Sequence, residues 1–299
     1  MSEFRSGFVC FVGRPNTGKS TLTNALVGAK VAITSDRPQT TRHTIRGIMH
    51  REDFQIILVD TPGLHRPRTL LGKRLNDLVR DTYSQVDVIA LCIPADEAIG
   101  TGDRWIYQQI RAVAPKTTLV VVVTKIDKVS KDRVAAQLLA VSELVGAGAE
   151  IVPVSAATGE QIDVLVDVLA AQLPPGPAFY PDGELTDEPE EVLMAEFIRE
   201  AALEGVRDEL PHSLAVVIEE VAPREGRDDL IDVHAILYVE RSSQKGIVIG
   251  KGGARLREVG TAARVQIEKL LGTKVYLDLH VKIAKNWQRD PKQLGRLGF

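Results

Sequence analysis

Residues 13–20 are the strongest candidate for a chemical site in this sequence. They follow the pattern GxxxxGK[ST] and come directly after a short apolar run. Glycines at this spacing let backbone N–H groups turn inward around phosphate oxygens, at the positive end of the following helix. Lys19 is expected to neutralise the β- and γ-phosphates of a nucleotide, and Ser20 to bind Mg²⁺. The predicted nucleotide contacts are Gly13, Arg14, Pro15, Asn16, Thr17, Gly18, Lys19 and Ser20.

A second candidate lies further along the chain, where an apolar run ends in Asp60-Thr61-Pro62-Gly63. An aspartate at the carboxyl end of a strand can hold Mg²⁺ through water, and the Gly63 N–H can bond the γ-phosphate and sense its presence. Alone, this sequence is also a good turn. Together with residues 13–20, it predicts nucleotide contacts at Asp60, Thr61, Pro62, Gly63 and the adjacent Leu64.

The polar segment 35–43 lies between these two motifs and lacks any periodicity, which is typical of a loop. A threonine hydroxyl in such a loop can complete the Mg²⁺ shell only while the γ-phosphate is present. We expect Thr41 rather than Thr40 to do this. The predicted metal ligands are therefore Ser20, Thr41 and Asp60, and the groups expected to act in catalysis are Lys19, Thr41 and Gly63.

Two later segments favour guanine as the base. One apolar run leads into Thr124-Lys125-Ile126-Asp127, and the next leads into Ser155-Ala156-Ala157. The Asp127 carboxylate can accept from guanine N1–H and N2–H₂, whereas adenine offers no matching donors and would leave it unpaired. The Lys125 stem would pack along the base, and a backbone N–H near Ala156 would reach guanine O6.

The elements that must position these motifs alternate between strand and helix. Short, nearly continuous apolar runs, typical of strands buried on both faces of a mainly parallel sheet, occur at 8–12, 55–60, 86–93, 119–124 and 151–154. Amphipathic segments such as 74–84 and 131–144 separate most of them. This alternation predicts an α/β, doubly wound domain, whose ligands bind beyond the carboxyl ends of the strands.

A change of composition marks the end of this domain. Residues 173–191 contain five prolines and no Lys or Arg, with six acidic residues after Pro181. Proline restricts the backbone and removes donors, so we expect a stiff, solvated linker. The predicted organisation is a nucleotide-binding domain over 1–172, a linker over 173–191 and a smaller domain over 192–299.

The charge of the chain is unevenly distributed. The whole chain of 299 residues carries a net charge of −3, which by itself argues against a nucleic-acid partner. Residues 241–299 alone have thirteen basic and four acidic side chains, a net of +9, which leaves −12 for the rest. A swing of this size indicates a basic face. The alternative is a lysine-rich solvated surface.

The second domain has a glycine loop within its basic segment. A helix to about residue 206, strands at 213–221 and 230–239, helices at 244–249 and 254–271 and a strand at 275–282 give the order αββααβ. This order resembles an α+β KH domain of type II. Glycines at both ends of the loop let the backbone approach a nucleic-acid phosphate, and the neighbouring apolar residues can line a groove for single-stranded bases. The predicted RNA contacts are Ile247, Ile249, Gly250, Lys251, Gly252 and Gly253; the alternative is a helical-hairpin turn.

The remaining composition predicts an intracellular globular protein. No apolar stretch approaches the ~18 residues of a membrane span, and the N-terminus does not resemble a signal peptide. The two cysteines, Cys10 and Cys92, lie in apolar runs, so we expect buried, reduced thiols in the cytoplasm. We also expect a monomer.

The motifs and their order resemble the translation-factor-related GTPases. The sequences GRPNTGKST, PQTTRH and DTPGLH are similar to those of the Era family in particular, and the similarity extends through the second domain. The resemblance implies GTP hydrolysis with Mg²⁺ and a P-loop GTPase domain followed by a KH domain. It also implies binding near the 3′ end of small-subunit (16S-type) rRNA, a role in small ribosomal subunit assembly and maturation, and peripheral membrane association.

Two residues bear on the mechanism. Thr124 stands where the base motif usually begins with Asn, and Leu64 stands where many signalling GTPases have a water-positioning glutamine. Era-like GTPases share an apolar residue at the second position. Because leucine cannot orient water, we expect slow intrinsic turnover. Our hypothesis is that Asn16 helps to hold a K⁺ ion, which supplies the positive charge that an arginine finger provides in other GTPases. The alternative role of Asn16 is a turn residue.

Two rival functions remain. One is an RNA-binding scaffold whose nucleotide site turns over negligibly, which single-turnover GTP hydrolysis with and without rRNA would test. The other is an ATP-dependent kinase built on the same loop, which nucleotide competition would test.

Overall fold

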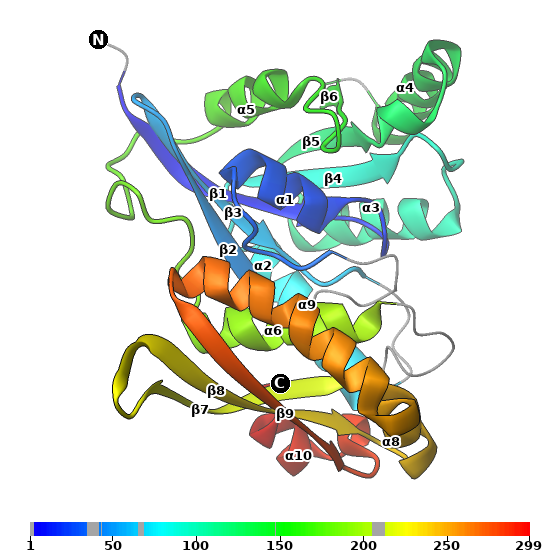
Figure 1. Cartoon of the computed structure of the whole chain (residues 1–299). Coiled ribbons are helices and arrows are strands. Elements are labelled where there is room, and N and C mark those ends of the chain that lie inside the picture. The colour runs from blue at the N-terminus through cyan, green and yellow to red at the C-terminus, as the bar shows by residue number, and fades with distance from the viewer. Residues whose placement is uncertain (1–2, 35–41, 43, 65–68, 147, 205–212) are drawn as a thin grey trace. The chain divides into compact units, whose positions relative to one another are not determined.

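The computed structural model describes residues 3–34, 42, 44–64, 69–146, 148–204 and 213–299 (Figure 1). Most of the chain up to Asp187 forms one compact unit; among the described residues, 69–74 and 188–299 form another. The segment with the predicted Mg²⁺ ligand Thr41 lies outside the described residues. Among the described residues, no helix is long and apolar enough to cross a membrane.

The first unit is built around a mostly parallel sheet. Its described strands lie in the order β2-β3-β1-β4-β5-β6, and only β2 is antiparallel to its neighbour. The strands are β1 (Arg5–Val12), β2 (Ile45–His50), β3 (Phe54–Asp60), β4 (Val88–Pro94), β5 (Thr118–Thr124) and β6 (Glu150–Pro153). Every residue of β3 and β4 is buried, which confirms that their apolar runs are covered on both faces. The sequence pattern does not reveal β2, because Arg46 and Gly47 interrupt its apolar residues.

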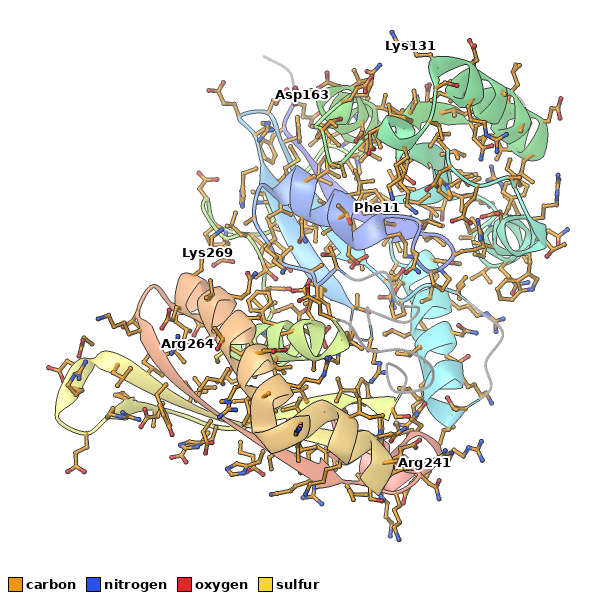
Figure 2. The ribbon with its side chains drawn as sticks, turned by 45° about the vertical axis from the view of Figure 1, so that its right-hand side comes forward. Phe11, Lys131, Asp163, Arg241, Arg264 and Lys269 are labelled. Atoms are coloured by element: carbon orange, nitrogen blue, oxygen red, sulfur yellow. The ribbon has the colours of Figure 1, made fainter. Side chains whose placement is uncertain are left out.

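Helices cover both faces of this sheet, so the predicted doubly wound architecture is confirmed. They are α1 (Lys19–Val27), α2 (Leu70–Tyr83), α3 (Thr101–Val113), α4 (Lys131–Val145) and α5 (Ile162–Ala171). One core lies between the sheet and α1 and α5, and the other between the sheet and α2, α3 and α4. Phe11 of β1 points into the first core, while Lys131 and Asp163 lie on the outside (Figure 2).

The second unit has a smaller sheet in the order β7-β8-β9, with β7 antiparallel and β9 parallel to β8. Helices α6 and α9 pack together, and both contact this sheet. The element order αββααβ is as predicted. The elements are α6 (Glu190–Leu203), β7 (Ala215–Arg224), β8 (Arg227–Val239), α8 (Ser242–Ile249), α9 (Ala254–Leu271) and β9 (Lys274–Ile283), followed by α10 (Pro291–Arg296).

The predicted linker does not run free through solvent. Residues 174–187, which we name the strap, bind along the first unit. The N–H of Ser6 donates to the Pro174 carbonyl at 3.2 Å, and the N–H of Ile48 donates to the Leu185 carbonyl at 2.8 Å. Prolines cannot donate, but their carbonyls accept, and edge strand β2 offers N–H groups that need partners. Most residues of the strap are exposed to solvent, and its composition does not reveal these backbone hydrogen bonds.

Candidate nucleotide-binding site and RNA-binding loop

The predicted phosphate-binding loop, residues 13–18, connects the end of β1 to the start of α1. Gly18 precedes the helix with φ 93°, a left-handed conformation that favours glycine. The Lys19 side chain is buried, and its Nζ donates to the carbonyl of Arg14 at 2.9 Å. Burial lowers the pKa of Lys19, while the nearby Asp60 carboxylate opposes this shift. The loop therefore encloses a cation that a phosphate can stabilise.

Ser20 and Asp60 meet at the start of α1 and the end of β3. Ser20 Oγ donates to Asp60 Oδ2 at 2.7 Å, and Asp60 is completely buried. A hydroxyl and a carboxylate are the hard oxygen donors that Mg²⁺ prefers, so these two predicted ligands fit the metal. The third predicted ligand, Thr41, is among the residues not described.

The segment after β3 lies against the phosphate-binding loop. A Cβ atom on Gly63 would lie 2.9 Å from the backbone nitrogen of Pro15, so this close approach needs glycine. Thr61 Oγ1 donates to the Phe11 carbonyl at 2.9 Å and fixes the turn. Leu64 is only 3% exposed and belongs to the core, as expected for an apolar side chain that cannot orient water.

The predicted base-recognition residues follow β5 and β6, which are neighbours in the sheet. Ser155 Oγ donates to Asp127 Oδ1 at 2.6 Å, which fixes the carboxylate, and Ile126 anchors the turn in the core. Thr124 Oγ1 donates to the Thr17 carbonyl at 2.6 Å and so joins this end of the site to the phosphate-binding loop. Ala156 and Ala157 lie in the turn that follows Ser155.

Several side chains that hold this site were not predicted from the sequence. Arg14 pairs with Glu97 and Asp103, and Asp96 lies 3.8 Å from the Lys125 ammonium group. The sequence position of Asp96 and Glu97 was a usable signal. Both follow closely after β4, so they lie at the same sheet edge as the other motifs. The residue pattern of α4 gives no sign of Gln137, a buried side chain that donates to the backbone carbonyls of Pro94 and Glu97.

The predicted RNA-binding loop joins α8 to α9. Three of its glycines have positive φ: Gly250 at 72°, Gly252 at 58° and Gly253 at 76°. This conformation disfavours any side chain, and it presents the Lys251 side chain to solvent. Ile247 is 53% exposed on α8, while Ile249 is half-buried at the end of that helix.

Basic side chains accompany the loop. Arg257 donates from its guanidinium to the Gly252 carbonyl at 3.2 Å. Arg241, before α8, and Arg264 and Lys269, on α9, are exposed (Figure 2). The positive charge counted in the sequence therefore includes exposed groups on the helices that flank the loop.

Both halves of the chain match known families. A model described as a 50S ribosome-binding GTPase matches residues 8–125, and a KH domain model matches residues 209–288. The chain is 89% identical to GTPase Era of Mycobacterium sp. strain JLS and 88% identical to GTPase Era of Mycolicibacterium smegmatis, over the full length of each chain.

Solved structures agree with the sequence comparison. Era in complex with MgGDPNP and nucleotides 1506–1542 of 16S ribosomal RNA has a TM-score of 0.95 and 36% identity, covering 99% of both chains. A variant of Era from Aquifex aeolicus bound to GDP·AlF4⁻ gives the same TM-score, identity and coverage. With a full-length relative at 89% identity, this chain belongs to the Era family of GTPases.

Proposed function

We propose that this chain is a Mg²⁺-dependent GTPase switch that binds small-subunit rRNA near its 3′ end and acts in small-subunit assembly and maturation. The observation that carries the proposal is the hydrogen bond between Thr124 and Thr17. It joins residues 124–127, which we name the base-recognition turn, to the phosphate-binding loop in one site. The second support is the glycine loop of the KH domain, 250–253, with its exposed lysine.

At the phosphate end, Lys19 neutralises charge on the β- and γ-phosphates, and the Gly63 N–H senses the γ-phosphate. Ser20, Asp60 and Thr41 hold Mg²⁺, which when bound neutralises charge that develops on the phosphates. The loop backbone contributes the remaining phosphate contacts. Because Leu64 lies in the core, no side chain at that position orients the attacking water, and turnover is slow without activation.

At the base end, Asp127 accepts from guanine N1–H and N2–H₂. The bond from Ser155 Oγ holds one oxygen of that carboxylate in place, which reduces the freedom lost on binding. The stem of Lys125 lies along the base, and a backbone N–H at Ala156 reaches O6. This pairing excludes adenine, because adenine lacks the two donors.

The RNA partner is proposed from the loop and from the relative solved with a 16S rRNA fragment. Single-stranded rRNA lies with its backbone against 250–253 and its bases on Ile247 and Ile249. We propose domain boundaries at 172 and 192, a monomer, and a cytoplasmic location, where ribosomal subunits are assembled. We also propose peripheral contact with the inner face of the cell membrane, which only the family resemblance supports.

The nucleotide assignment is tested with Asp127→Asn. Asn presents a donor to guanine N2 but matches the carbonyl of xanthine, so GDP affinity should fall at least ~100-fold while XDP affinity rises. Competition titrations with GDP, XDP and ADP measure the preference. A variant that keeps its GDP affinity contradicts guanine recognition by Asp127, and displacement of GDP by ADP in the wild-type chain supports the kinase alternative. Wild-type single-turnover GTP hydrolysis, with and without rRNA, tests the scaffold alternative.

The RNA assignment is tested with Gly252→Asp, which adds negative charge and a disfavoured left-handed residue to the loop. Binding to an RNA of nucleotides 1506–1542 of 16S rRNA should fall at least ~30-fold, with GDP affinity unchanged. The matched control is Gly226→Asp, at a glycine of φ 75° in the β7–β8 hairpin of the same domain. Equal losses in both variants would mean that strain rather than the loop surface reduces binding.

A further inference from the structure

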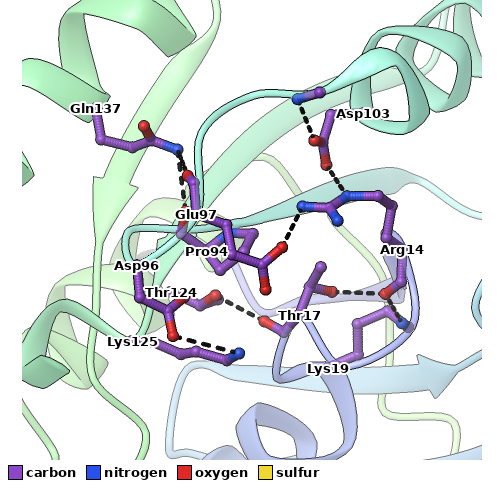
Figure 3. Close-up of polar contacts among 11 residues, drawn as sticks. Arg14, Thr17, Lys19, Pro94, Asp96, Glu97, Asp103, Thr124, Lys125 and Gln137 are labelled. Carbon is purple, nitrogen blue, oxygen red and sulfur yellow. Dashed lines mark hydrogen bonds and ion pairs between the residues drawn. The ribbon is translucent and has the colours of Figure 1, made fainter. Parts of the chain in front are cut away.

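The loop that follows β4 contacts both ends of the nucleotide site (Figure 3). We name residues 94–97, which are the last residue of β4 and the three that follow it, the brace loop. Its Glu97 carboxylate lies 2.9 Å from the Arg14 guanidinium, and its Asp96 carboxylate lies 3.8 Å from the Lys125 ammonium group. The Ala95 N–H also donates to the Thr124 carbonyl at 2.8 Å. One four-residue segment is thus bonded to the phosphate-binding loop and to the base-recognition turn.

A single buried side chain fixes the brace loop from below. Gln137 of α4 is 3% exposed, and its Nε2 donates to the Pro94 and Glu97 carbonyls, each at 3.0 Å. A glutamine amide has two N–H donors, and both are used here on backbone at the two ends of the brace loop. Gln137 therefore sets the conformation from which Asp96 and Glu97 project.

The side chain of Arg14 runs away from the phosphate-binding loop to two carboxylates. Its Nε donates to Asp103 Oδ1 at 2.8 Å, while its terminal nitrogen pairs with Glu97. Asp103 is 1% exposed, and its other oxygen accepts the Gly100 N–H at 2.9 Å, so this carboxylate is itself held in place. Figure 3 shows the guanidinium between these two acids.

Helix α3 leaves room for this arrangement only because Gly102 has no side chain. A Cβ atom on Gly102 would lie 2.8 Å from Arg14 Cδ, closer than carbon atoms normally approach. The glycine lies in the first turn of α3, where it costs helix stability relative to alanine. Glu97, Asp103 and Gly102 together therefore determine the path of the Arg14 side chain.

The backbone of Arg14 connects this arrangement to the phosphate end. The Arg14 carbonyl accepts from Lys19 Nζ at 2.9 Å and from Thr17 Oγ1 at 3.0 Å. A shift of Arg14 would therefore move the lysine that neutralises the phosphates. We propose that Arg14 is a positioning residue that fixes the phosphate-binding loop through Glu97 and Asp103, and that Gln137 and the brace loop keep the phosphate and base ends in one geometry.

This proposal rests on the proposed guanine-nucleotide site, and it separates Arg14 from a catalytic arginine that would stabilise the transferring phosphate. Loss of a positioning residue weakens GDP and GTP binding together. In Arg14→Ala and Asp103→Asn, we expect both Kd values to rise ~5- to 20-fold, as for a lost charge-assisted hydrogen bond, with kcat within ~3-fold. In Glu97→Gln the rise should be smaller, less than ~5-fold, because Glu97 is half-exposed and its ion pair is screened by solvent. Arg14→Lys should restore part of the affinity, because it keeps the charge without the planar fork.

A catalytic arginine predicts a different pattern. Arg14→Ala would then lower kcat ~10³-fold with GDP affinity unchanged, and Glu97→Gln, by releasing the guanidinium, would raise kcat. Either result overturns the proposal. Isothermal titration with GDP and single-turnover hydrolysis of GTP measure the two quantities separately.

Gly102→Ala tests the same geometry without removing any charged or hydrogen-bonding group. It should raise the Kd for GDP ~5- to 20-fold by displacing Arg14 from its two carboxylates. The control is Gly295→Ala in α10, where an added Cβ meets nothing within 4 Å. Unchanged GDP affinity in Gly102→Ala contradicts the positioning role.

Gln137→Leu tests the brace loop from the opposite side. It removes both amide donors at a buried site, and the matched control is Gln108→Leu at an exposed position of α3. We expect weaker GDP binding only in the buried variant. If wild-type chain fails to bind GDP, the proposed function fails; if it binds and all variants bind equally, only the positioning proposal fails.

Discussion

Thr124 Oγ1 donates a 2.6 Å hydrogen bond to the carbonyl oxygen of Thr17, across 107 residues of sequence. The bond lies where β5 ends beside the phosphate-binding loop, and Thr124 is 4% exposed. The motif usually begins with the longer Asn at this position. Here the strand end brings the hydroxyl of the shorter threonine directly to the loop backbone.

We expect Thr124→Val to weaken GDP and GTP binding by ~5- to 20-fold. The substitution keeps the shape of the side chain but replaces the donor with a methyl group, which leaves the Thr17 carbonyl without this partner in a buried position. Equilibrium titration with both nucleotides measures the effect. The control is Thr118→Val at the other end of β5, and equal affinities in the two variants would contradict a role for the bond.

The two thiols should be unreactive in the folded chain. Cys10 and Cys92 are completely buried, and burial raises the pKa of each from 9.0 to about 12. At pH 8 only ~10⁻⁴ of each would be thiolate. Because the thiol pKa is higher in the folded than in the unfolded chain, the protonated thiols contribute to the free energy of unfolding. This contribution is complete below pH 9 and is lost as pH rises towards 12.

Ellman's reagent at pH 8 measures this directly. We expect no prompt reaction in the folded chain and two thiols in guanidinium chloride. Leu139→Cys, at a position that is 69% exposed on α4, provides a reactive control. Rapid stoichiometric labelling of the native wild-type chain would contradict this prediction, because it would show that β1 and β4 open often enough to expose the two thiols.

The candidate site could be predicted from the sequence because its motifs are local. Asp60, Thr124 and Ser155 each follow an apolar run, and parallel strands place their carboxyl ends at one edge. This is why the fold class and the order of motifs could be predicted. Hydrogen bonds such as Ser155 to Asp127 depend on which strands are neighbours, and only the sheet order fixes that.

Other features have no local signal. Gln137 lies on an ordinary amphipathic helix, and its role depends on two backbone carbonyls presented by a distant loop. The prolines and acids of the strap are typical of a solvated linker, and they give no sign of its hydrogen bonds to the first unit. Its binding depends on Gln55 and on the β2 edge, and neither is visible in the composition of residues 174–187.

Gln55→Leu should release the strap. Gln55 is 1% exposed on β3, and its amide bonds to the backbone of Phe179 at 2.7 Å and of Tyr180 at 2.9 and 3.1 Å. Losing these three bonds should lower the free energy of unfolding by ~2–3 kcal/mol and expose the segment to chymotrypsin.

Limited proteolysis followed by mass spectrometry locates the cut after Phe179 or Tyr180. The matched control is Gln172→Leu, an exposed position just after α5. If Gln55→Leu is cleaved no faster than the control, then the ring contact between Phe8 and Phe179, with centroids 5.2 Å apart, holds the strap without the amide.

Turnover should be faster in K⁺ than in Na⁺. Leu64 is buried in the core, and its side chain can neither orient water nor stabilise charge, so another group must stabilise the charge of the transition state. Asn16 has φ 64° in the phosphate-binding loop, and its amide oxygen is a suitable ligand for a monovalent cation there. We expect single-turnover GTP hydrolysis, with 16S rRNA fragment present, to be at least ~10-fold faster in K⁺. In Asn16→Ala the ratio of the two rates should fall towards one, and equal rates in the wild-type chain would exclude the K⁺ hypothesis.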